Sequence, residues 1–381
     1  MNEALLQRLR QSLAQREGST LRRQLTARAS SDTRVNLADN DYLGLARDPA
    51  VVAAGVAALQ EWGASSSASP LVTGYTEIHQ QLAQTLAAWQ GYTHGLVMNT
   101  GFAANSAVLG GLPKKGDLIL ADRLVHASML DGILASGARL RRFAHNDLDA
   151  LELMLHEEPA LDGVIFVVTE SVYSMDGDSP DLKRLASLRK RFGFCWVLDE
   201  AHATGWYGST GSGLQEGQGA FAAADIVVGT LGKGLGSQGA YVLSHAPEVR
   251  DALINFAGEF VYSTYLAPSC AAAALAAIEC VKGMSGERAE LPALSHAWRD
   301  GLVEAGFAVP SGDSPIIPLI LGDSDVTLKY ATALRAAGFM VSAIRPPTVP
   351  VRTGRIRISL RRGLSPAVLS SFVSALKGVT A

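Results

Sequence analysis

The chain has 381 residues, of which 48% are hydrophobic, and its 33 Lys and Arg residues against 36 Asp and Glu residues give a formal net charge of -3. This length permits a large buried core and more than one domain, and the balanced charge gives no basis for a nucleic-acid partner. The three cysteines form no C-x-x-C pair, so the sequence predicts neither a disulfide framework nor a zinc site and favours a cytoplasmic protein.

The N-terminal segment has no apolar core typical of a signal peptide, and residues 1 to about 30 are expected to form an Arg-rich amphipathic helix. Its apolar face would carry Leu5, Leu6, Leu9 and Leu13. The segment 36–45 mixes Asn, Asp and Gly with large apolar residues, which is typical of a packed irregular loop. Leu266 to Val281 is the most apolar long segment, but Pro268 and Glu279 interrupt it, so we expect a buried helix and no membrane span.

From about residue 48 helical and strand patterns alternate, which predicts βαβ units and a mostly parallel sheet. An amphipathic helix is expected over 80–90 and a short strand over 95–98, leading into Asn-Thr-Gly-Phe-Ala-Ala-Asn at 99–105. A glycine where a strand turns into a helix leaves free N–H groups that can bind a phosphate. Alone, this pattern is also what an ordinary turn would show.

Four of the expected strands are each followed by polar residues. The strands are 118–120, 164–168, 196–198 and 226–228, and the residues that follow are Asp122 and His126, Glu170 and Ser174, Asp199 and His202, and Thr230 and Lys233. Each residue alone has a structural explanation, such as capping a helix or pairing with a nearby cation. Ligands of open α/β sheets bind at the carboxyl ends of the strands, so the coincidence favours a shared site.

Lys233 lies in the sequence Gly-Thr-Leu-Gly-Lys-Gly-Leu-Gly, which has four glycines in eight residues and follows an apolar strand. A lysine whose pKa is lowered can form a Schiff base with a carbonyl such as that of pyridoxal phosphate (PLP). A single lysine in a glycine-rich loop is more often a solvated surface residue. The remaining motifs must decide between these two interpretations.

Three similar patterns are excluded by their context. Residues 234–239 fit the dinucleotide pattern G-x-G-x-x-G, but 240–243 predict a strand where that fold requires a helix. A P-loop needs Ser or Thr after its lysine, and here Gly234 follows. Residues 199–202 spell the DEAH box of some helicases, which requires such a P-loop. A metal site formed by Asp199, Glu200 and His202 lacks further ligands at suitable spacing, so no metal is expected.

A second region begins near residue 285, where the regular alternation weakens. We expect helices over 296–305 and 327–337 and strands over 316–321 and 355–360. Three prolines within 346–350 should make this segment rigid, so we expect a fixed surface and not a mobile loop. Arg345 and Arg357 fit two interpretations, as surface charges or as partners of a substrate carboxylate.

Several of these motifs together resemble the fold-type I PLP enzymes, and more closely their α-oxoamine synthase branch, over essentially the whole chain. The motifs are Asp199-Glu-Ala-His202 about thirty residues before Thr230-Leu-Gly-Lys233-Gly, together with Asn40-Asp-Tyr-Leu-Gly-Leu, Thr100-Gly-Phe-Ala-Ala-Asn105, His126-Ala-Ser128, Glu170-Ser-Val-Tyr-Ser174 and Tyr262-Ser-Thr264. Residues 143–147 and 345–350 are similar to branch members that join L-alanine to a pimeloyl thioester for biotin synthesis. Residues 64–70 depart from the glycine-rich segment usual before Val72-Thr-Gly74.

The resemblance implies an α/β protein of PLP-dependent transferase fold type I with PLP as its cofactor. A large PLP-binding domain with a mostly parallel central sheet would span 48–284, and a smaller α+β domain would combine 285–381 with the N-terminal arm 1–47. The protein would be a homodimer with its active sites at the subunit interface. No membrane or nucleic-acid partner is implied.

The resemblance also implies a role for each matching residue. Lys233 would bind PLP and later act as a base, Asp199 would face the pyridine nitrogen, and His202 would hydrogen-bond the phenolic oxygen. His126 would stack on the ring. Gly101, Phe102 and Thr230 would hold the phosphate, with Thr264 from the other subunit, while Glu170 and Ser174 would line the cofactor site.

The expected substrates are L-alanine and a pimeloyl thioester carried on coenzyme A or on acyl carrier protein. Arg357 would bind the amino-acid carboxylate, and Arg22, Thr348 and Arg345 would face the pimeloyl group, with Asn40 and His126 also contacting substrate. Two alternatives remain open. One is a sister synthase that uses glycine or serine with another acyl group, and the other is a binding protein without activity.

Overall fold

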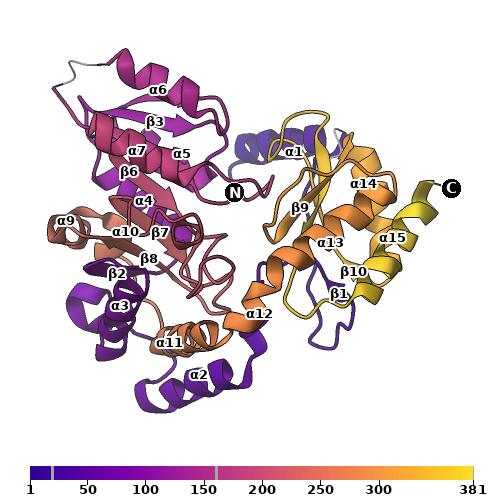
Figure 1. Cartoon of the computed structure of the whole chain (residues 1–381), viewed down its shortest axis with the longest axis horizontal. Helices are drawn as coiled ribbons and strands as arrows, with labels where there is room; N and C mark the ends of the chain where they lie inside the picture. Colours follow the sequence, from indigo (N-terminus) through magenta and orange to yellow (C-terminus); the bar gives the residue numbers. More distant parts are fainter. Residues whose placement is uncertain (19–20, 159–161, 381) are drawn as a thin grey trace. The chain divides into compact units, whose positions relative to one another are not determined.

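The structure, a computed structural model, describes residues 1–18, 21–158 and 162–380. The chain divides into two compact units (Figure 1), one comprising Asn40–Leu291 and the other Met1–Asp39 together with Pro292–Ala381. The N-terminal segment therefore belongs to the same unit as the C-terminal part. This division lies a few residues from the boundaries at 47 and 284 that the sequence analysis expects.

The larger unit is built on a sheet whose described strands number seven (Figure 1). Their order is β2-β8-β7-β6-β5-β3-β4, and all neighbours are parallel except those of β8. The predicted mostly parallel sheet is confirmed. The strands are β2 (His94–Met98), β3 (Leu118–Asp122), β4 (Arg139–Phe143), β5 (Ile165–Glu170), β6 (Cys195–Asp199), β7 (Ile226–Thr230) and β8 (Ala240–Ser244). Central strands of such a sheet are covered on both faces, which is why β3, β7 and β8 are buried throughout.

Helices connect and cover these strands. They are η1 (Leu45–Arg47), α2 (Pro49–Trp62), η2 (Pro70–Gly74), α3 (Glu77–Trp89), α4 (Gly101–Gly111), α5 (Ala127–Ser136), α6 (Leu148–His156), α7 (Leu182–Phe192), α8 (Leu214–Gly217), α9 (Pro247–Phe256), α10 (Gly258–Val261), α11 (Pro268–Gly283) and α12 (Ser285–Ala289). Several start at a side chain that accepts a backbone N–H, as Asp48, Asp147 and Asp181 do. The alanine-rich helix α11 packs against α2 and is largely buried, as the sequence predicts. In the described ranges no helix combines the length and apolarity needed to cross a membrane.

The segment that departs from the family pattern is anchored by backbone contacts. Ala68 accepts a hydrogen bond from the amide of Tyr265, and Ser66 donates from Oγ to the carbonyl of Leu266 at 2.5 Å. A Cβ at Gly74 would lie 2.2 Å from the Ala68 carbonyl oxygen, so this glycine is required by close backbone approach. Residues 64–70 thus hold an irregular path without the usual glycines.

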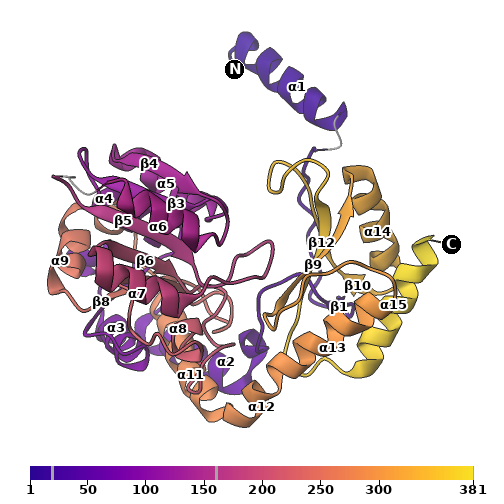
Figure 2. The same cartoon turned by 45° about the horizontal axis from the view of Figure 1, so that its top comes forward.

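The smaller unit has an antiparallel three-stranded sheet, β11 (Ser342–Ile344), β12 (Gly354–Ser359) and β9 (Ile316–Gly322), and a short parallel pair, β1 (Val35–Asn36) with β10 (Phe339–Met340). Helices α14 (Ser324–Ala336) and α15 (Pro366–Thr380) lie beside these strands, as Figure 2 shows. Helix α13 (Leu291–Glu304) joins the core where Trp298 meets Phe372, with ring centroids 5.5 Å apart. The helices and strands expected here are present, with boundaries shifted by a few residues.

The N-terminal helix is shorter than the sequence analysis expects. Helix α1 spans Glu3–Gly18 and contains no buried residue. Its leucines are partly exposed, with Leu5 at 37% and Leu9 at 47%. Residues 21–34 form no helix, so the expectation that the helix extends to about residue 30 is wrong; positions 19–20 lie outside the described residues. Glycine at position 18 disfavours continuation of a helix that has no packed face to stabilise it.

Candidate active site

The carboxyl ends of four adjacent strands meet at one edge of the large sheet. In the order β7, β6, β5, β3 these strands end at Thr230, Asp199, Glu170 and Asp122. Glu170 and Asp199 are direct partners in the sheet register. The structure therefore brings together the polar groups that the sequence places at the ends of separate strands.

Lys233 is the first residue of a buried hydrogen-bonded chain. Its Nζ lies 2.7 Å from Nε2 of His202, and Nδ1 of His202 lies 2.6 Å from the hydroxyl of Tyr42. Tyr42 donates in turn to Oδ1 of Asn40 at 3.1 Å. All three contacts are satisfied when His202 carries its proton on Nδ1, which leaves Nε2 to accept from the lysine ammonium. Tyr42 is fully buried, and the sequence analysis missed its role because it is only one of several apolar residues in segment 36–45.

The glycines around Lys233 are required by close packing. A Cβ at Gly234 would lie 2.2 Å from the carbonyl oxygen of Thr204, and one at Gly236, where φ is 60°, would lie 2.3 Å from the amide nitrogen of Ala46. Gly236 also donates to the carbonyl of Lys233. The lysine is thus held on a packed turn and is half-buried, unlike a solvated surface lysine.

Asp199 is held by two donors that leave it 7% exposed. Its Oδ1 accepts from the amide of Ala201 at 2.7 Å and its Oδ2 from Nδ2 of Asn105 at 2.9 Å. Asn105 also donates to Oγ of Ser128 at 3.1 Å, and that hydroxyl lies 2.8 Å from Nδ1 of His126. One amide therefore orients both the carboxylate and, through Ser128, the exposed histidine ring. Sequence reasoning quoted Asn105 and Ser128 only as parts of motifs and gave them no role.

Glu170 is 3% exposed, and its Oε1 accepts from the backbone amide of His126 at 2.6 Å. Burial, followed by the nearby negative charge of Asp199, raises the pKa of Glu170 well above its ordinary value. The protonated acid is thereby favoured, which avoids two adjacent negative charges on paired strands. The carboxyl can hold the His126 amide in either protonation state.

Replacing Glu170 by glutamine is expected to leave the free energy of unfolding within about 1 kcal/mol of the wild-type value, because the amide oxygen can still accept from His126. Replacing it by alanine should lower that free energy by about 1–3 kcal/mol, because a buried donor loses its partner. Urea unfolding of both variants measures the difference. Equal destabilisation by both substitutions would show that the ionised carboxylate is needed.

Helix α4 presents its N-terminus at the same sheet edge. Thr100 caps the helix by accepting the amide of Ala103 at 3.1 Å, and Gly101 lies beside Thr230. The first N–H groups of a helix, here those of Gly101 and Phe102, have no acceptor within the helix and attract a phosphate. An amine, an imidazole, a carboxylate and a helix N-terminus at one edge fit the functional groups of PLP.

The remaining expected cofactor residues lie at this edge or on exposed loops. Ser174 is half-buried in the turn that follows β5. Thr264 is exposed, and its carbonyl accepts from Nδ2 of Asn99 at 2.8 Å. Phe102 is 52% exposed. Exposed positions such as Phe102 and Thr264 are available to a ligand or a second subunit.

The three charged residues of the DEAH sequence are held by different partners. Glu200 is buried and accepts from the amides of Leu214 at 3.0 Å and Gln215 at 2.9 Å, while Asp199 and His202 have the contacts given above. Among the residues that the structure describes, no group of three His, Cys, Asp or Glu residues is arranged to hold a metal ion. Glu200 thus holds the first two residues of α8.

The smaller unit contains four of the residues expected to bind the substrates, namely Arg22, Arg345, Thr348 and Arg357, whereas Asn40 and His126 lie in the larger unit. Arg357 on β12 is 5% exposed and donates from Nη1 to Oγ of Ser359 at 2.6 Å. A cavity of about 170 Å³ is lined by Leu21, Arg23, Ala343, Ile344, Arg345, Pro346 and Thr348. Burial, then the positive charges of Arg23 and Arg335, lower the pKa of Arg345.

Arg345 and Thr348, both expected to face the pimeloyl group, line this cavity together with Arg23, the neighbour of the expected Arg22. Arg23 donates from Nη2 to Oγ1 of Thr348 at 2.8 Å, whereas Arg22 pairs with Glu17 at 2.6 Å. Two guanidinium groups and a hydroxyl at one small cavity suit a carboxylate. Adjacent arginines in an irregular segment cannot be told apart from sequence, because no periodicity shows which side chain faces inward.

The sequence matches the profile of the aminotransferase class I and II family over residues 32–376. It is 41% identical over 345 residues to the 8-amino-7-oxononanoate synthase of Geotalea daltonii, which covers 90% of this chain and 88% of that protein. The synthase of Geobacter metallireducens is 43% identical over 327 residues, covering 85% and 83%.

Two solved structures extend this likeness to three dimensions. A serine palmitoyltransferase variant from S. paucimobilis with bound PLP superimposes with a TM-score of 0.90 at 29% identity, covering 98% of this chain and 97% of that one. The 8-amino-7-oxononanoate synthase of Francisella tularensis gives a TM-score of 0.78 at 27% identity, covering 92% and 98%. The similarity therefore includes both units of the chain.

Proposed function

The chain belongs to the aminotransferase class I and II family, and on that premise we propose that it is a PLP-dependent acyltransferase of biotin synthesis. It condenses L-alanine with a pimeloyl thioester and releases 8-amino-7-oxononanoate, carbon dioxide and the free carrier thiol. The observation that carries this proposal is identity of 40–43% with 8-amino-7-oxononanoate synthases over most of both chains. The edge with Lys233, His202 and Asp199 supports the chemistry.

Bound PLP would supply an electron sink for negative charge at the α carbon of the amino acid. Lys233 would hold the cofactor through Nζ and, with alanine bound, would take up and return the α proton. His202, 2.7 Å from Nζ, orients the amine and would hydrogen-bond the phenolic oxygen of the cofactor. Asp199 would keep the pyridine nitrogen protonated, because an anion at that position favours its cationic form.

The other residues of the sheet edge position the cofactor. His126 would stack on the ring, and Gly101, Phe102 and Thr230 would bind the phosphate, joined by Thr264 of a second copy. Glu170 and Ser174 would line the site beside His126. The exposed positions of Phe102 and Thr264 support a homodimer with shared sites, in which a second copy covers them.

Arg357 binds the carboxylate of alanine, with Asn40 also contacting substrate. The cavity at Arg345 and Thr348 takes the distal carboxylate of the pimeloyl group, and Arg23 supplies a second guanidinium there. A cytoplasmic location is supported by the three cysteines, none of which forms a disulfide in the described structure. Acyl carrier protein or coenzyme A would deliver the acyl group.

The two adjacent arginines give a matched pair of variants for the acyl site. We expect Arg23→Ala to raise the KM for the pimeloyl thioester by about 10- to 100-fold with little change in kcat, because it removes a charge-assisted hydrogen bond made in both ground and transition states. Arg22→Ala should change the KM less than about threefold, since its contact in this structure is Glu17. The reverse ranking would favour the sequence-based assignment of Arg22.

The test of the function itself is thiol release by the PLP-loaded protein. L-alanine, glycine and serine are each combined with pimeloyl, acetyl, succinyl and palmitoyl coenzyme A. Turnover confined to alanine with pimeloyl coenzyme A is expected. A sister synthase is the second candidate, because the chain superimposes on a serine palmitoyltransferase with a TM-score of 0.90. Turnover only with serine and palmitoyl coenzyme A would establish it.

A further inference from the structure

A row of titratable groups lies along the edge of the sheet that carries the site. Three carboxyl groups, those of Asp199, Glu170 and Asp122, end the adjacent strands β6, β5 and β3. Lys233 follows β7 on one side of this row, and His145 follows β4 on the other. Buried carboxylates need a counter-charge or hydrogen-bond donors, and Asp122 is completely buried. His145 is placed to supply both.

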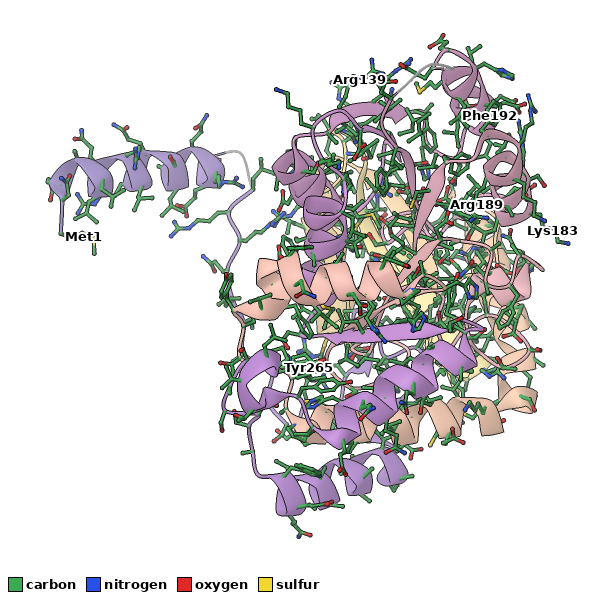
Figure 3. All side chains as sticks on the ribbon, turned by 90° about the vertical axis from the view of Figure 1, so that its left-hand side faces the viewer. Met1, Arg139, Lys183, Arg189, Phe192 and Tyr265 are labelled. Carbon is green, nitrogen blue, oxygen red and sulfur yellow. The ribbon has the colours of Figure 1, made fainter. Side chains whose placement is uncertain are left out.

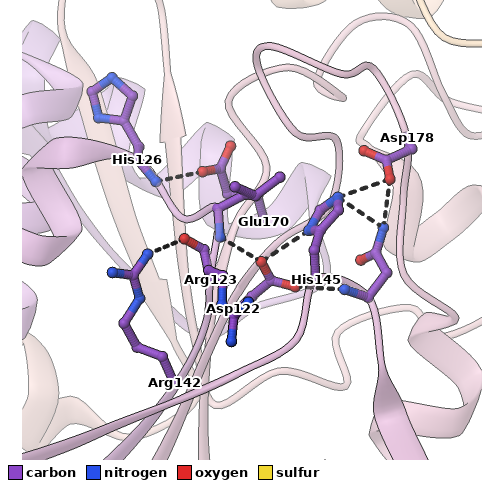
Figure 4. Close-up of polar contacts among 9 residues, drawn as sticks. Asp122, Arg123, His126, Arg142, His145, Glu170 and Asp178 are labelled. Carbon is purple, nitrogen blue, oxygen red and sulfur yellow. Dashed lines mark hydrogen bonds and ion pairs between the residues drawn. The ribbon is translucent and has the colours of Figure 1, made fainter. Parts of the chain in front are cut away.

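His145 bridges two carboxylates that come from different segments (Figure 4). Its Nδ1 lies 2.9 Å from Oδ1 of Asp122 and its Nε2 lies 2.8 Å from Oδ2 of Asp178. The adjacent Asn146 also bridges the two carboxylates. Its backbone N–H donates to Oδ2 of Asp122 at 2.7 Å, and its side-chain Nδ2 donates to Oδ2 of Asp178 at 2.8 Å. Because both ring nitrogens face acceptors, the contacts are fully satisfied by a ring protonated at both positions.

The first carboxylate organises the segment that leads to His126. Oδ1 of Asp122 accepts from the amide of Leu124 at 2.7 Å, and the carbonyl of Arg123 accepts from Nη2 of Arg142 on β4. The amide of His126 is then held by Glu170, as Figure 4 also shows. The segment from β3 to His126 is therefore held at its start by Asp122, the carboxylate that His145 contacts.

Asp178, which carries the second carboxylate, also closes the turn that contains Ser174, through its backbone carbonyl. The amide of Tyr173 donates to the carbonyl of Asp178 at 3.0 Å, and the amide of Gly177 donates to that of Tyr173 at 2.8 Å, so Ser174 lies within a closed turn. The ring of His145 also packs edge-on against the ring of Tyr173, with centroids 4.4 Å apart and an interplanar angle of 90°. His145 thus contacts both residues at the base of this turn.

We propose that His145 is a positioning residue of the cofactor site, which ties the segment leading to His126 and the turn carrying Ser174 to each other. It acts through Asp122, Asp178 and Tyr173 and touches neither substrate nor cofactor. This role rests on the proposed PLP function. Cofactor affinity then depends on His145, although the residue lies outside the group of residues that would bind PLP.

The charge state of the ring agrees with this geometry. Burial lowers the pKa of His145, but hydrogen bonds and charge attraction from Asp122 and Asp178 outweigh it and raise the pKa to about 10. Among the described residues, the charged or titratable groups in contact with the ring are these two carboxylates and Tyr173. His145 therefore remains an imidazolium at neutral pH, and a neutral amide cannot replace it as a counter-charge.

The test compares His145→Gln with His156→Gln, the same substitution at an exposed histidine on α6 that contacts Arg191. PLP is removed, and its Kd is measured by absorbance titration for the wild type and each variant. We expect His145→Gln to raise the Kd at least about tenfold and His156→Gln to change it less than about twofold. Equal Kd values for the two variants would overturn the proposal. A wild-type protein that binds no PLP would instead refute the proposed function.

A double-mutant cycle separates positioning from general destabilisation. Ser174→Ala should raise the PLP Kd by a larger factor in the wild-type background than in the His145→Gln background, because the turn is already displaced in the latter. The same factor in both backgrounds would contradict the proposed coupling. Should His145→Gln fail to fold, Asp178→Ala removes the side-chain link from His145 to the turn while leaving Asp122 paired. This variant should also raise the Kd for PLP, and its effect should be non-additive with that of Ser174→Ala. A Kd equal to that of the wild type would overturn the proposal.

Discussion

Replacing Lys233 by alanine is expected to lower kcat by about 10⁴-fold or more, because the substitution removes both the group that we propose to hold PLP and the base that we propose to move the α proton. The folded structure should persist, since Lys233 is only half-buried on its turn. PLP added to the variant should remain exchangeable on dialysis. In the wild-type protein, borohydride reduction should attach PLP permanently to the peptide that contains Lys233, and mass spectrometry identifies that peptide.

Lys183 provides the matched control. It is exposed on α7, and its side chain points outward in Figure 3. Lys183→Ala should keep kcat within about twofold of the wild-type value and leave PLP attached, because surface substitutions away from structural features have small effects. Comparable loss of turnover in both variants would remove Lys233 from the mechanism.

Replacing Asp199 by asparagine is expected to lower kcat by about 10²- to 10³-fold while PLP stays attached to Lys233. The substitution removes the negative charge that we propose to favour a protonated pyridine nitrogen, but it keeps the size of the side chain. The amide of Asn105 can rotate so that its oxygen, which has no hydrogen-bond partner among the described residues, accepts from the new side chain. Loss of activity should therefore exceed any loss of stability.

Asp225→Asn tests whether that effect is specific to the edge that carries the site. Asp225 pairs with Arg189 and accepts from the amide of Trp196 at 2.8 Å, at the opposite ends of β6 and β7. We expect this variant to unfold at a lower temperature with kcat almost unchanged. A comparable fall in kcat for both variants would mean that charge in the unit as a whole, and not at Asp199, controls the rate.

The sheet and the edge that carries the site could be predicted because strong local patterns determine them. Short β-branched runs predict buried parallel strands, and the carboxyl ends of adjacent parallel strands must meet. The polar residues that follow the strands, such as Asp199 and Lys233, are therefore placed close together by topology alone. The glycines around Lys233 are also explained, since Gly234 and Gly236 pack against other backbone segments.

Contacts between segments distant in sequence could not be predicted. Tyr42 reaches His202 across 160 positions, and Asn105 reaches Asp199 across 94. Neither residue has a local signal, because tertiary packing decides which of several side chains on a loop or helix faces the site. The expectation for helix α1 is wrong for the opposite reason. Its periodic leucines predict a face packed against other segments, but the described structure buries none of them.

The central claim is a condensation in which alanine loses its carboxyl group, and labelled alanine tests it directly. The PLP-loaded protein is given pimeloyl coenzyme A and L-alanine carrying carbon-13 only in the carboxyl group. The account predicts that all of the label leaves as carbon dioxide, in equal amount to the thiol released, and that the 8-amino-7-oxononanoate formed contains none. Label retained in the product, or thiol release without decarboxylation, would contradict it.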